Sequence, residues 1–377
     1  MTPYLSKKLA VMRFLAVVAI IWFHAYFATY GGSGTGAFLP TDLFARPFLP
    51  RFWSLAVMRW GMPFLGGLSG YLFFRSLSPS VAAFSAKYRR RFWSLLVPFL
   101  IWSALGLLYV VAAQTLDFGR APEAESVRSI GAGLRMWLVQ PAMGQLWFLQ
   151  SLMGCVLVAP IIYVCVSSTR GWVLVAGLVW WVSGWPSSSQ LLWMSPTVFF
   201  PFIVGAAFSI LRWRAPRLPR WLVPLLLPLW LCACALYALL GSGHGYGARA
   251  GLLGVVALGV PAVWFGFDLA AARARRWRAL SAAASSVSTY SFFLYLCQFP
   301  LLSLLAHRAL PYSGDDQWVR LLQYVVVWAL TVAASVGAAV AMRRRLPRAY
   351  ALMTGGRHAP RTGHPLPGAA VIEPAEP

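Results

Sequence analysis

Charged residues are scarce in this chain, and acidic residues are the scarcest of them. Of the 377 residues, 11% are charged and 59% are hydrophobic, with 9 Asp and Glu against 32 Lys and Arg. A soluble globular domain usually carries about 25% charged residues. The chain therefore has too little polar surface to face water on all sides, which excludes an ordinary soluble protein.

Cysteine is also sparse and follows no pattern that chemistry would require. The five cysteines all lie within apolar runs, without a CxxC pair and without a His at metal-ligand spacing. A disulfide framework or a zinc site would need such a pattern. The sequence therefore predicts no metal site, and the cysteines are most simply small buried residues.

Long apolar runs make up most of the chain. A membrane helix needs about 20 mainly apolar residues, and ten segments approach this length. They are 9–28, 52–74, 92–113, 145–166, 172–185, 191–211, 221–240, 249–267, 287–307 and 318–342. The sequence therefore predicts an all-α integral membrane protein with about ten transmembrane helices.

The basic residues gather in short stretches between the apolar runs. Most of the 32 lie on alternate loops, starting with Lys7 and Lys8 and ending with Arg343, Arg344 and Arg345. Cytoplasmic loops carry such an excess, so both chain ends are expected in the cytoplasm, in a protein of the inner or plasma membrane. These stretches would face anionic lipid headgroups, and nucleic acid is not expected as a partner.

One membrane domain, 1–348, is expected to be followed by a tail. Residues 349–377 are rich in Pro, Gly and Ala, which is typical of disordered chain, here on the cytoplasmic side. The sequence shows no internal repeat of the kind that many transporters carry. No feature of the sequence indicates an oligomeric state.

Two ionisable residues lie within the first apolar segment. Arg13 and His24 are 11 positions apart, so a helix places them on one face, about 16 Å apart along its axis. Ionisable groups in membrane helices are costly and are candidates for function. His24, with an ordinary pKa of about 6.5, would suit a general base. The alternative is that both side chains extend to the headgroups at the helix ends.

The second apolar segment has small residues at its centre. Pro63, Gly66, Gly67, Ser69 and Gly70 fall within eight positions. Such a pattern favours a kink and close helix packing. The alternative is a role for Ser69 on a substrate path.

A basic run precedes the third apolar segment. Lys87, Arg89, Arg90 and Arg91 would serve as topology markers there. The alternative is that they hold the phosphates of a cytoplasmic cofactor, because arginine pairs well with phosphate oxygens.

Four of these segments, taken in order, carry a family pattern. They are the Arg-x10-His spacing of 13–24, the P-F-L-G-G-L-S-G-Y-L run of 63–72, which is similar to a P-x-F-x-x-x-S-G-Y-L pattern, the basic entry at 87–98 and the L-W-F-L of 146–149. Together they resemble the acyltransferase-3 family, which includes enzymes that O-acylate bacterial surface polysaccharides. The chain departs from the family at Gln150 and Ser151, where some relatives have Arg and Asp, and at Gln298, where relatives have His.

The resemblance implies an O-acyltransferase. It would move an acyl group, commonly acetyl, from a cytoplasmic acyl-CoA such as acetyl-CoA to a hydroxyl of a cell-surface or lipid-linked glycan. The CoA compound is then a substrate, and no permanently bound cofactor is expected. The expected catalytic residues are His24, as base or transient acyl carrier, and Arg13, which would also bind the donor.

The other expected site residues are less specific. Arg89, Arg90 and Arg91 would bind the donor phosphates, and Ser69, Trp147 and Gln298 would line the substrate path. No carboxylate lies within the apolar runs to orient His24, so a Ser, a backbone carbonyl or Gln298 would have to do so. Two other functions stay open: a permease or flippase for a glycan or lipid-linked intermediate, and an inactive relative that acts as a scaffold.

Overall fold

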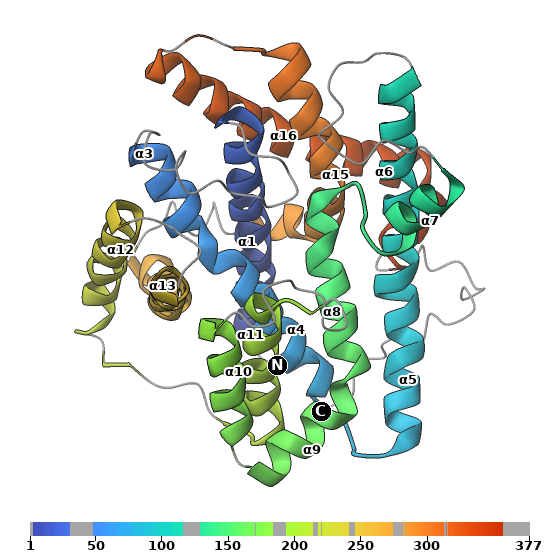
Figure 1. The fold of residues 1–377 in the computed structure, drawn as a ribbon. Coiled ribbons are helices and arrows are strands. Elements are labelled where there is room, and N and C mark those ends of the chain that lie inside the picture. The colour runs from blue at the N-terminus through green and yellow to red at the C-terminus, as the bar shows by residue number, and fades with distance from the viewer. Residues whose placement is uncertain are drawn as a thin grey trace.

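The computed structural model describes residues 3–30, 48–115, 129–169, 171–183, 194–213, 218–219, 221–240, 246–273, 282, 284–312, 314 and 316–356. Every regular element in these ranges is a helix, and none of them contains a strand, so the expected all-α class is confirmed there. The helices cross at steep angles: Figure 1 shows α13 end-on while the α5 and α6 column is seen lengthwise.

Helix α1 (Pro3–Tyr30) lies at the centre and packs against α15 (Ser291–Leu304) and α16 (Gln317–Arg345). Tyr324 links α16 to its neighbours, because its hydroxyl donates to the Trp22 carbonyl at 3.2 Å and lies 2.6 Å from the Ser54 hydroxyl. The Trp22 ring also meets the Tyr324 ring edge-on at 4.8 Å. In a membrane the burial of apolar surface contributes little to helix association, so aromatic and hydrogen-bonded contacts of this kind hold the helices together.

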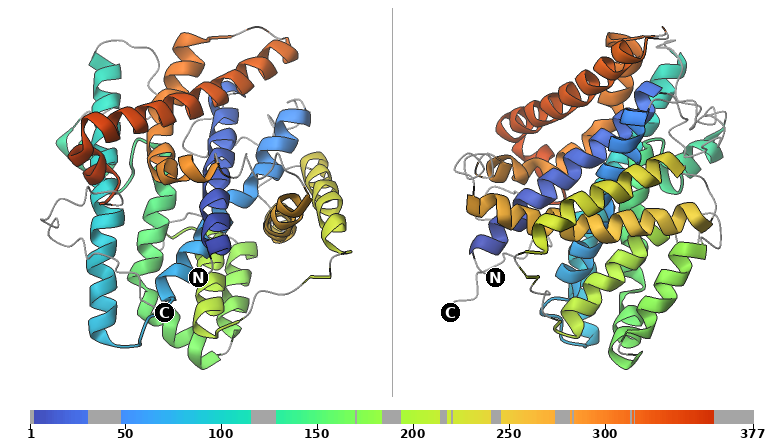
Figure 2. Two further views of the ribbon diagram at one scale, coloured as in Figure 1. Left: turned by 180° about the vertical axis from the view of Figure 1, so that it is seen from behind. Right: turned by 90° about the vertical axis from the view of Figure 1, so that its left-hand side faces the viewer.

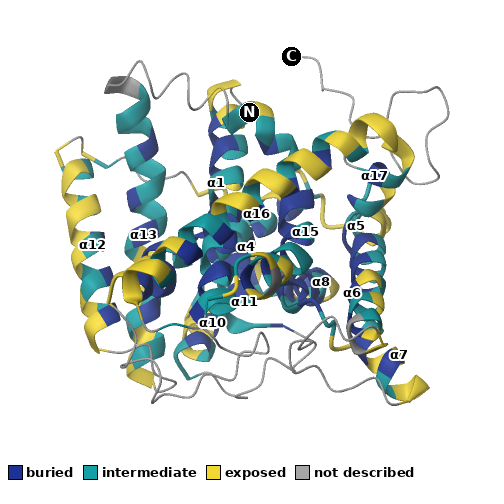
Figure 3. Cartoon of the chain, turned by 90° about the horizontal axis from the view of Figure 1, so that it is seen from above, coloured by how far each residue is buried: buried dark blue, intermediate teal, exposed yellow. Residues whose placement is uncertain are grey.

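On another side of α1 lie α12 (Val223–Leu240) and α13 (Tyr246–Arg273). The buried Lys8 ammonium lies 2.8 Å from the Asp268 carboxylate near the end of α13, and 3.6 Å from the centre of the Trp264 ring. The outer face of α12 is exposed along its length (Figure 3), and its exposed side chains include leucines such as Leu225 and Leu229. An apolar exposed face of this kind suits contact with lipid.

The second expected span is helical but not uniform. It begins with α3 (Phe48–Arg51), continues through the π-helical η1 (Phe52–Ala56) and the 3₁₀ η2 (Val57–Trp60), and ends in α4 (Gly61–Phe74). Such departures from α geometry within a helical segment often mark functional positions.

The glycines of α4 let it approach α11 (Pro196–Ile210) closely. A Cβ on Gly70 would collide with the Phe202 carbonyl oxygen, and a Cβ on Gly205 with that of Gly67. The interpretation of this segment as close small-residue packing is confirmed.

A long column is formed by α5 (Val81–Arg91), the π-helical η3 (Phe92–Leu96) and α6 (Val97–Thr115), as Figures 1 and 2 show. The amphipathic α7 (Ile130–Leu138) was not expected from the sequence; the Ser129 hydroxyl caps it. The fourth expected span is η4 (Gly144–Leu146), α8 (Trp147–Leu157) and α9 (Ala159–Thr169), with a bend of 61° between α8 and α9. Helix α10 (Trp172–Ser183) follows.

The packed body extends beyond the expected domain end at residue 348. Helix α17 (Pro347–Met353) lies against α6, where the Trp102 indole donates to the Met353 carbonyl at 3.2 Å. Tyr350 and Thr354 are buried. The boundary therefore lies at least eight residues later than expected, because apolar Tyr350 fills a space in the core. The rest of the predicted tail, 357–377, lies outside the described residues.

Six helices in the described ranges are long and apolar enough to cross a membrane, or seven if the bent α8 and α9 pair is counted as one span. The protein is therefore a membrane protein. The expected number of ten is not reached by this criterion, since α10 and α11 are short and the 48–74 segment is divided by its π and 3₁₀ turns.

Candidate functional site

His24 faces α15, where its Nδ1 lies 3.2 Å from Oε1 of Gln298. The Gln298 Nε2 donates to the Tyr295 carbonyl at 2.9 Å, and this fixes which end of the amide faces His24. Because Oε1 can only accept, the contact places a proton on Nδ1 and leaves Nε2 as the nitrogen that can accept one. Gln298 is fully buried, so the orientation of the imidazole is well defined.

The Gln298 contact belongs to a larger buried network. The Tyr295 hydroxyl donates to the Gln145 carbonyl, and the Gln145 side chain donates back to the Leu296 carbonyl at 3.0 Å. All three polar side chains are buried. The network joins α15 to the short η4 turn, and it therefore positions Trp147, which begins α8.

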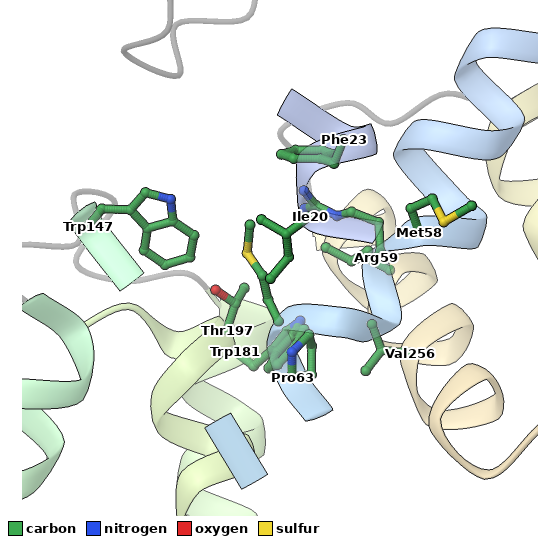
Figure 4. A pocket seen from close by; sticks show the side chains of 11 residues that line it. Ile20, Phe23, Met58, Arg59, Pro63, Trp147, Trp181, Thr197 and Val256 are labelled. Atoms are coloured by element: carbon green, nitrogen blue, oxygen red, sulfur yellow. The ribbon is translucent and has the colours of Figure 1, made fainter. Parts of the chain in front are cut away.

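A cavity of ≈ 140 Å³ lies between α1, the 48–74 segment, α8, α10, α11 and α13 (Figure 4). It is lined by Ile20, Phe23, Met58, Arg59, Met62, Pro63, Trp147, Trp181, Thr197, Leu252 and Val256. Ile20 lies one helical turn before His24 on the same face of α1, and the Phe23 and His24 rings are 5.5 Å apart. His24 itself is not among the lining residues, so it lies beside the cavity.

Arg59 is a residue of this site that the sequence analysis did not single out. Its guanidinium extends toward Phe23, 4.7 Å from the ring centre. Its position inside the apolar segment 52–74 was the available signal, because that same criterion singled out Arg13 and His24.

Arg13 lies on α1, as His24 does, but eleven residues closer to the N-terminus. Its side chain is exposed, and Nη2 donates a long hydrogen bond of 3.5 Å to the Ser288 carbonyl at the start of the α15 segment. Helix α1 thus contacts the 3₁₀ turn η5 (Ser288–Tyr290), which leads into α15, through Arg13 and Ser288, and it contacts α15 itself through His24 and Gln298.

The basic run at 87–91 ends α5. Arg89 and Arg90 are exposed, whereas the Arg91 guanidinium lies 5.7 Å from the Phe73 ring centre. Lys87 donates to the Arg75 carbonyl at 3.4 Å. Two guanidinium groups are therefore open to a ligand, and no hydrogen bond or ion pair joins this run to Arg13 within the described residues.

Ser69 and Trp147 have different surroundings. The Ser69 hydroxyl donates to the Leu65 carbonyl of its own helix at 2.7 Å, and Ser69 does not line the cavity. Trp147 does line it, on the side opposite Arg59 in Figure 4. Of the two, only Trp147 is placed to touch a molecule in the cavity.

Comparison with known proteins identifies the family of this chain. Residues 7–341 match the family model described as "Acyltransferase domain", of the acyltransferase-3 type. The chain is also 27% identical over 238 residues to the succinoglycan biosynthesis protein ExoH of Rhizobium meliloti (strain 1021), a match that covers 60% of each chain. No solved structure matches. Since the family model covers nearly the whole membrane body, the chain belongs to the acyltransferase-3 family.

Proposed function

We propose that this protein is an O-acyltransferase of the cell membrane that moves an acyl group from acyl-CoA to a hydroxyl of a cell-surface or lipid-linked glycan. Acetyl is the commonest acyl group for such an enzyme. The observation that carries the proposal is the orientation of His24 by Gln298 beside a cavity. The family supports acyl transfer, and a glycan acceptor is supported by the relative's name, which refers to succinoglycan biosynthesis.

In the proposed reaction His24 acts as the general base. Nε2 takes the proton of the acceptor hydroxyl while the hydroxyl oxygen attacks the thioester carbonyl carbon, whose π electrons move to the carbonyl oxygen. When the tetrahedral intermediate collapses, the C=O bond re-forms and the C–S bond breaks. The departing thiolate then takes the proton from the imidazolium. The products are an O-acyl ester and free CoA thiol.

Gln298 would keep His24 in the tautomer that this reaction needs. A neutral amide cannot balance the imidazolium charge as a carboxylate would, so its contribution is orientation. Gln298 is therefore a positioning residue, and the position at which relatives have His keeps a side chain that can hydrogen-bond to His24.

The donor would bind near Arg13, toward the N-terminal end of α1. Arg13 lies about 16 Å from His24 along α1, and the exposed Arg89 and Arg90 offer two further guanidinium groups. An extended donor with phosphates at one end and a thioester at the other would fit this distance, with its phosphates at the arginines and its thioester at His24. We assign the phosphates to the cytoplasmic side, where the basic residues gather.

We also propose ten crossings with both chain ends in the cytoplasm. The contacts support the placement of both ends on one side, because helices that would cross in the same direction are parallel. Helices α1 and α15, the first and ninth, pair residue 13 with 288 and 24 with 298. Helices α1 and α16, the first and tenth, pair 22 with 324 and 18 with 328, so they are antiparallel.

Mass spectrometry of surface and lipid-linked glycans tests the function. Cells would carry the intact protein, His24→Ala, or no protein, at equal membrane levels. The matched control is His307→Ala, at an exposed position of η6 (Leu305–Ala309). We expect an acyl mass increment with the intact protein and with His307→Ala, reduced about 10²-fold or more in His24→Ala. No increment with the intact protein would refute acyl transfer, and a full increment with His24→Ala would refute the role of His24.

A further inference from the structure

We propose that Arg59 is a further catalytic residue, which binds the carbonyl oxygen of the acyl group while that group occupies the cavity. This inference rests on the proposed acyl transfer and names the place of the acyl group within it. Two observations carry it: the size and lining of the cavity, and the absence of a carboxylate partner for Arg59 in the described part of the chain.

The cavity suits a short acyl group better than a sugar. A cavity of about 150 Å³ in another protein binds benzene, so ≈ 140 Å³ accommodates a group of a few carbon atoms. Among the eleven described residues that line it, Arg59 is the only charged one and Thr197 the only one with a hydroxyl. A sugar would need hydrogen-bond partners for several hydroxyls, whereas an acyl chain needs apolar walls and a partner for one oxygen.

The charge of Arg59 is not balanced by a carboxylate. The structure describes two acidic residues, Asp268 and Asp316. Asp268 pairs with Lys8, and Asp316 accepts from the backbone at the start of α16. Arg59 has the face of the Phe23 ring beside it instead. A half-buried cation in this setting is costly unless an anion approaches it, so the site is arranged for a ligand that brings negative charge.

The place of Arg59 matches where negative charge develops. Attack on a thioester moves the carbonyl π electrons onto its oxygen, and a fixed donor aimed at that oxygen stabilises the transition state. Arg59 reaches the cavity close to Phe23, the neighbour of His24 on α1 (Figure 4). Base and oxyanion donor thus approach the reacting carbon from adjacent positions, and the chain of the acyl group extends between Met62, Trp181 and Val256.

Acyl transfer in isolated membranes that contain the protein and its acceptor glycan tests the proposal. Acetyl-CoA, propionyl-CoA and butyryl-CoA are supplied, and the glycan products are measured by mass. We expect Arg59→Met to lower kcat about 10²–10³-fold with little change in KM, and Arg59→Lys to restore part of kcat because it keeps the charge. An Arg59→Met enzyme with unchanged kcat would overturn the proposal.

A cavity variant separates this role from general damage. Val256→Ala enlarges the cavity, so we expect the ratio of butyryl to acetyl transfer to rise several-fold. Leu227→Ala is the matched control, since Leu227 is exposed on α12 and lines no part of the cavity. An unchanged ratio in Val256→Ala would place the acyl group elsewhere and overturn the proposal. If the intact protein transfers no acyl group at all, the proposed function itself fails. If the intact protein transfers acyl groups and the Arg59 and Val256 variants match its activity, this inference alone fails.

Discussion

Nδ1 of His24 lies 3.2 Å from Oε1 of Gln298, although 274 residues separate them in the chain. The Tyr295 carbonyl holds the other end of the Gln298 amide, so the imidazole meets an acceptor in a fixed direction. The hydroxyl of the same residue, Tyr295, donates to the Gln145 carbonyl, and a single buried network therefore supports both His24 and the start of α8.

Loss of the Gln298 amide should lower activity without unfolding the protein. Gln298→Leu removes the acceptor for His24, and we expect kcat for acyl transfer to fall about 10-fold to 10²-fold with KM unchanged, because Nε2 is no longer held in the productive tautomer. Gln298→His should recover part of kcat, since an imidazole nitrogen can accept from Nδ1. The measurement is steady-state acyl transfer in isolated membranes. Equal kcat in Gln298→Leu and the intact protein would show that Gln298 does not position His24.

Ser69 should be dispensable for the chemistry. Its hydroxyl bonds within its own helix and does not line the cavity, so Ser69→Ala should leave kcat and KM within about twofold of the intact protein. Trp147→Ala, in contrast, opens one wall of the cavity and should reduce transfer at least tenfold. Glycan acylation measured at matched protein levels compares the two. A large loss of activity in Ser69→Ala would return Ser69 to the substrate path.

Gly70→Ala should destabilise the fold strongly. The added Cβ would collide with the Phe202 backbone oxygen on α11, which cannot move aside as a flexible side chain could, and overpacking of this kind costs about 1–3 kcal/mol or more. The control is Gly337→Ala on α16, where a Cβ meets nothing within 4 Å. Thermal unfolding in detergent should show a lower Tm for Gly70→Ala alone. Equal Tm values for both variants would contradict the close packing of α4 on α11.

The Lys8 and Asp268 pair should be strongly coupled. Lys8 is 2% exposed and Asp268 is 41% exposed, so we expect Asp268→Asn to cost about 1–3 kcal/mol because it leaves a buried ammonium without its counter-charge. Lys8→Met, which removes the buried charge as well, should lose less when added to Asp268→Asn than by itself. A double-mutant cycle on unfolding free energies measures the coupling. Additive effects would show that the two side chains are not energetically linked; Lys7→Met serves as the exposed control.

Reporter fusions should distinguish ten crossings from six. With ten, residues 75–80 lie in the cytoplasm because α3 to α4 forms the second crossing. If only the six long helices cross, the same residues lie outside. A fusion after Ser78 should therefore give green fluorescent protein fluorescence and no alkaline phosphatase activity, and a fusion after Leu240 the reverse. Phosphatase activity at Ser78 would refute the ten-crossing arrangement.

Several properties of this protein follow from its sequence alone. With 11% charged residues, the chain cannot form a water-covered surface, so the membrane class and the helical makeup were predictable from composition and the length of the apolar runs. Arg13 and His24 were identifiable as well, because ionisable residues stand out within an apolar segment. The glycines of 63–72 indicated close packing by their spacing.

Only the tertiary structure shows which residues meet. Gln298 looked like a departure from a family pattern, and its contact with His24 depends on the parallel packing of α1 and α15. Arg59 was one basic residue within an apolar segment of the sequence, and only the 3₁₀ turn of η2 and the cavity around it place it in the site. The extension of the packed body beyond residue 348 depends on the buried Tyr350, whose ring stacks on that of Phe293 in α15. Periodicity and composition act over neighbouring residues, whereas these contacts depend on helix packing between segments far apart in the chain.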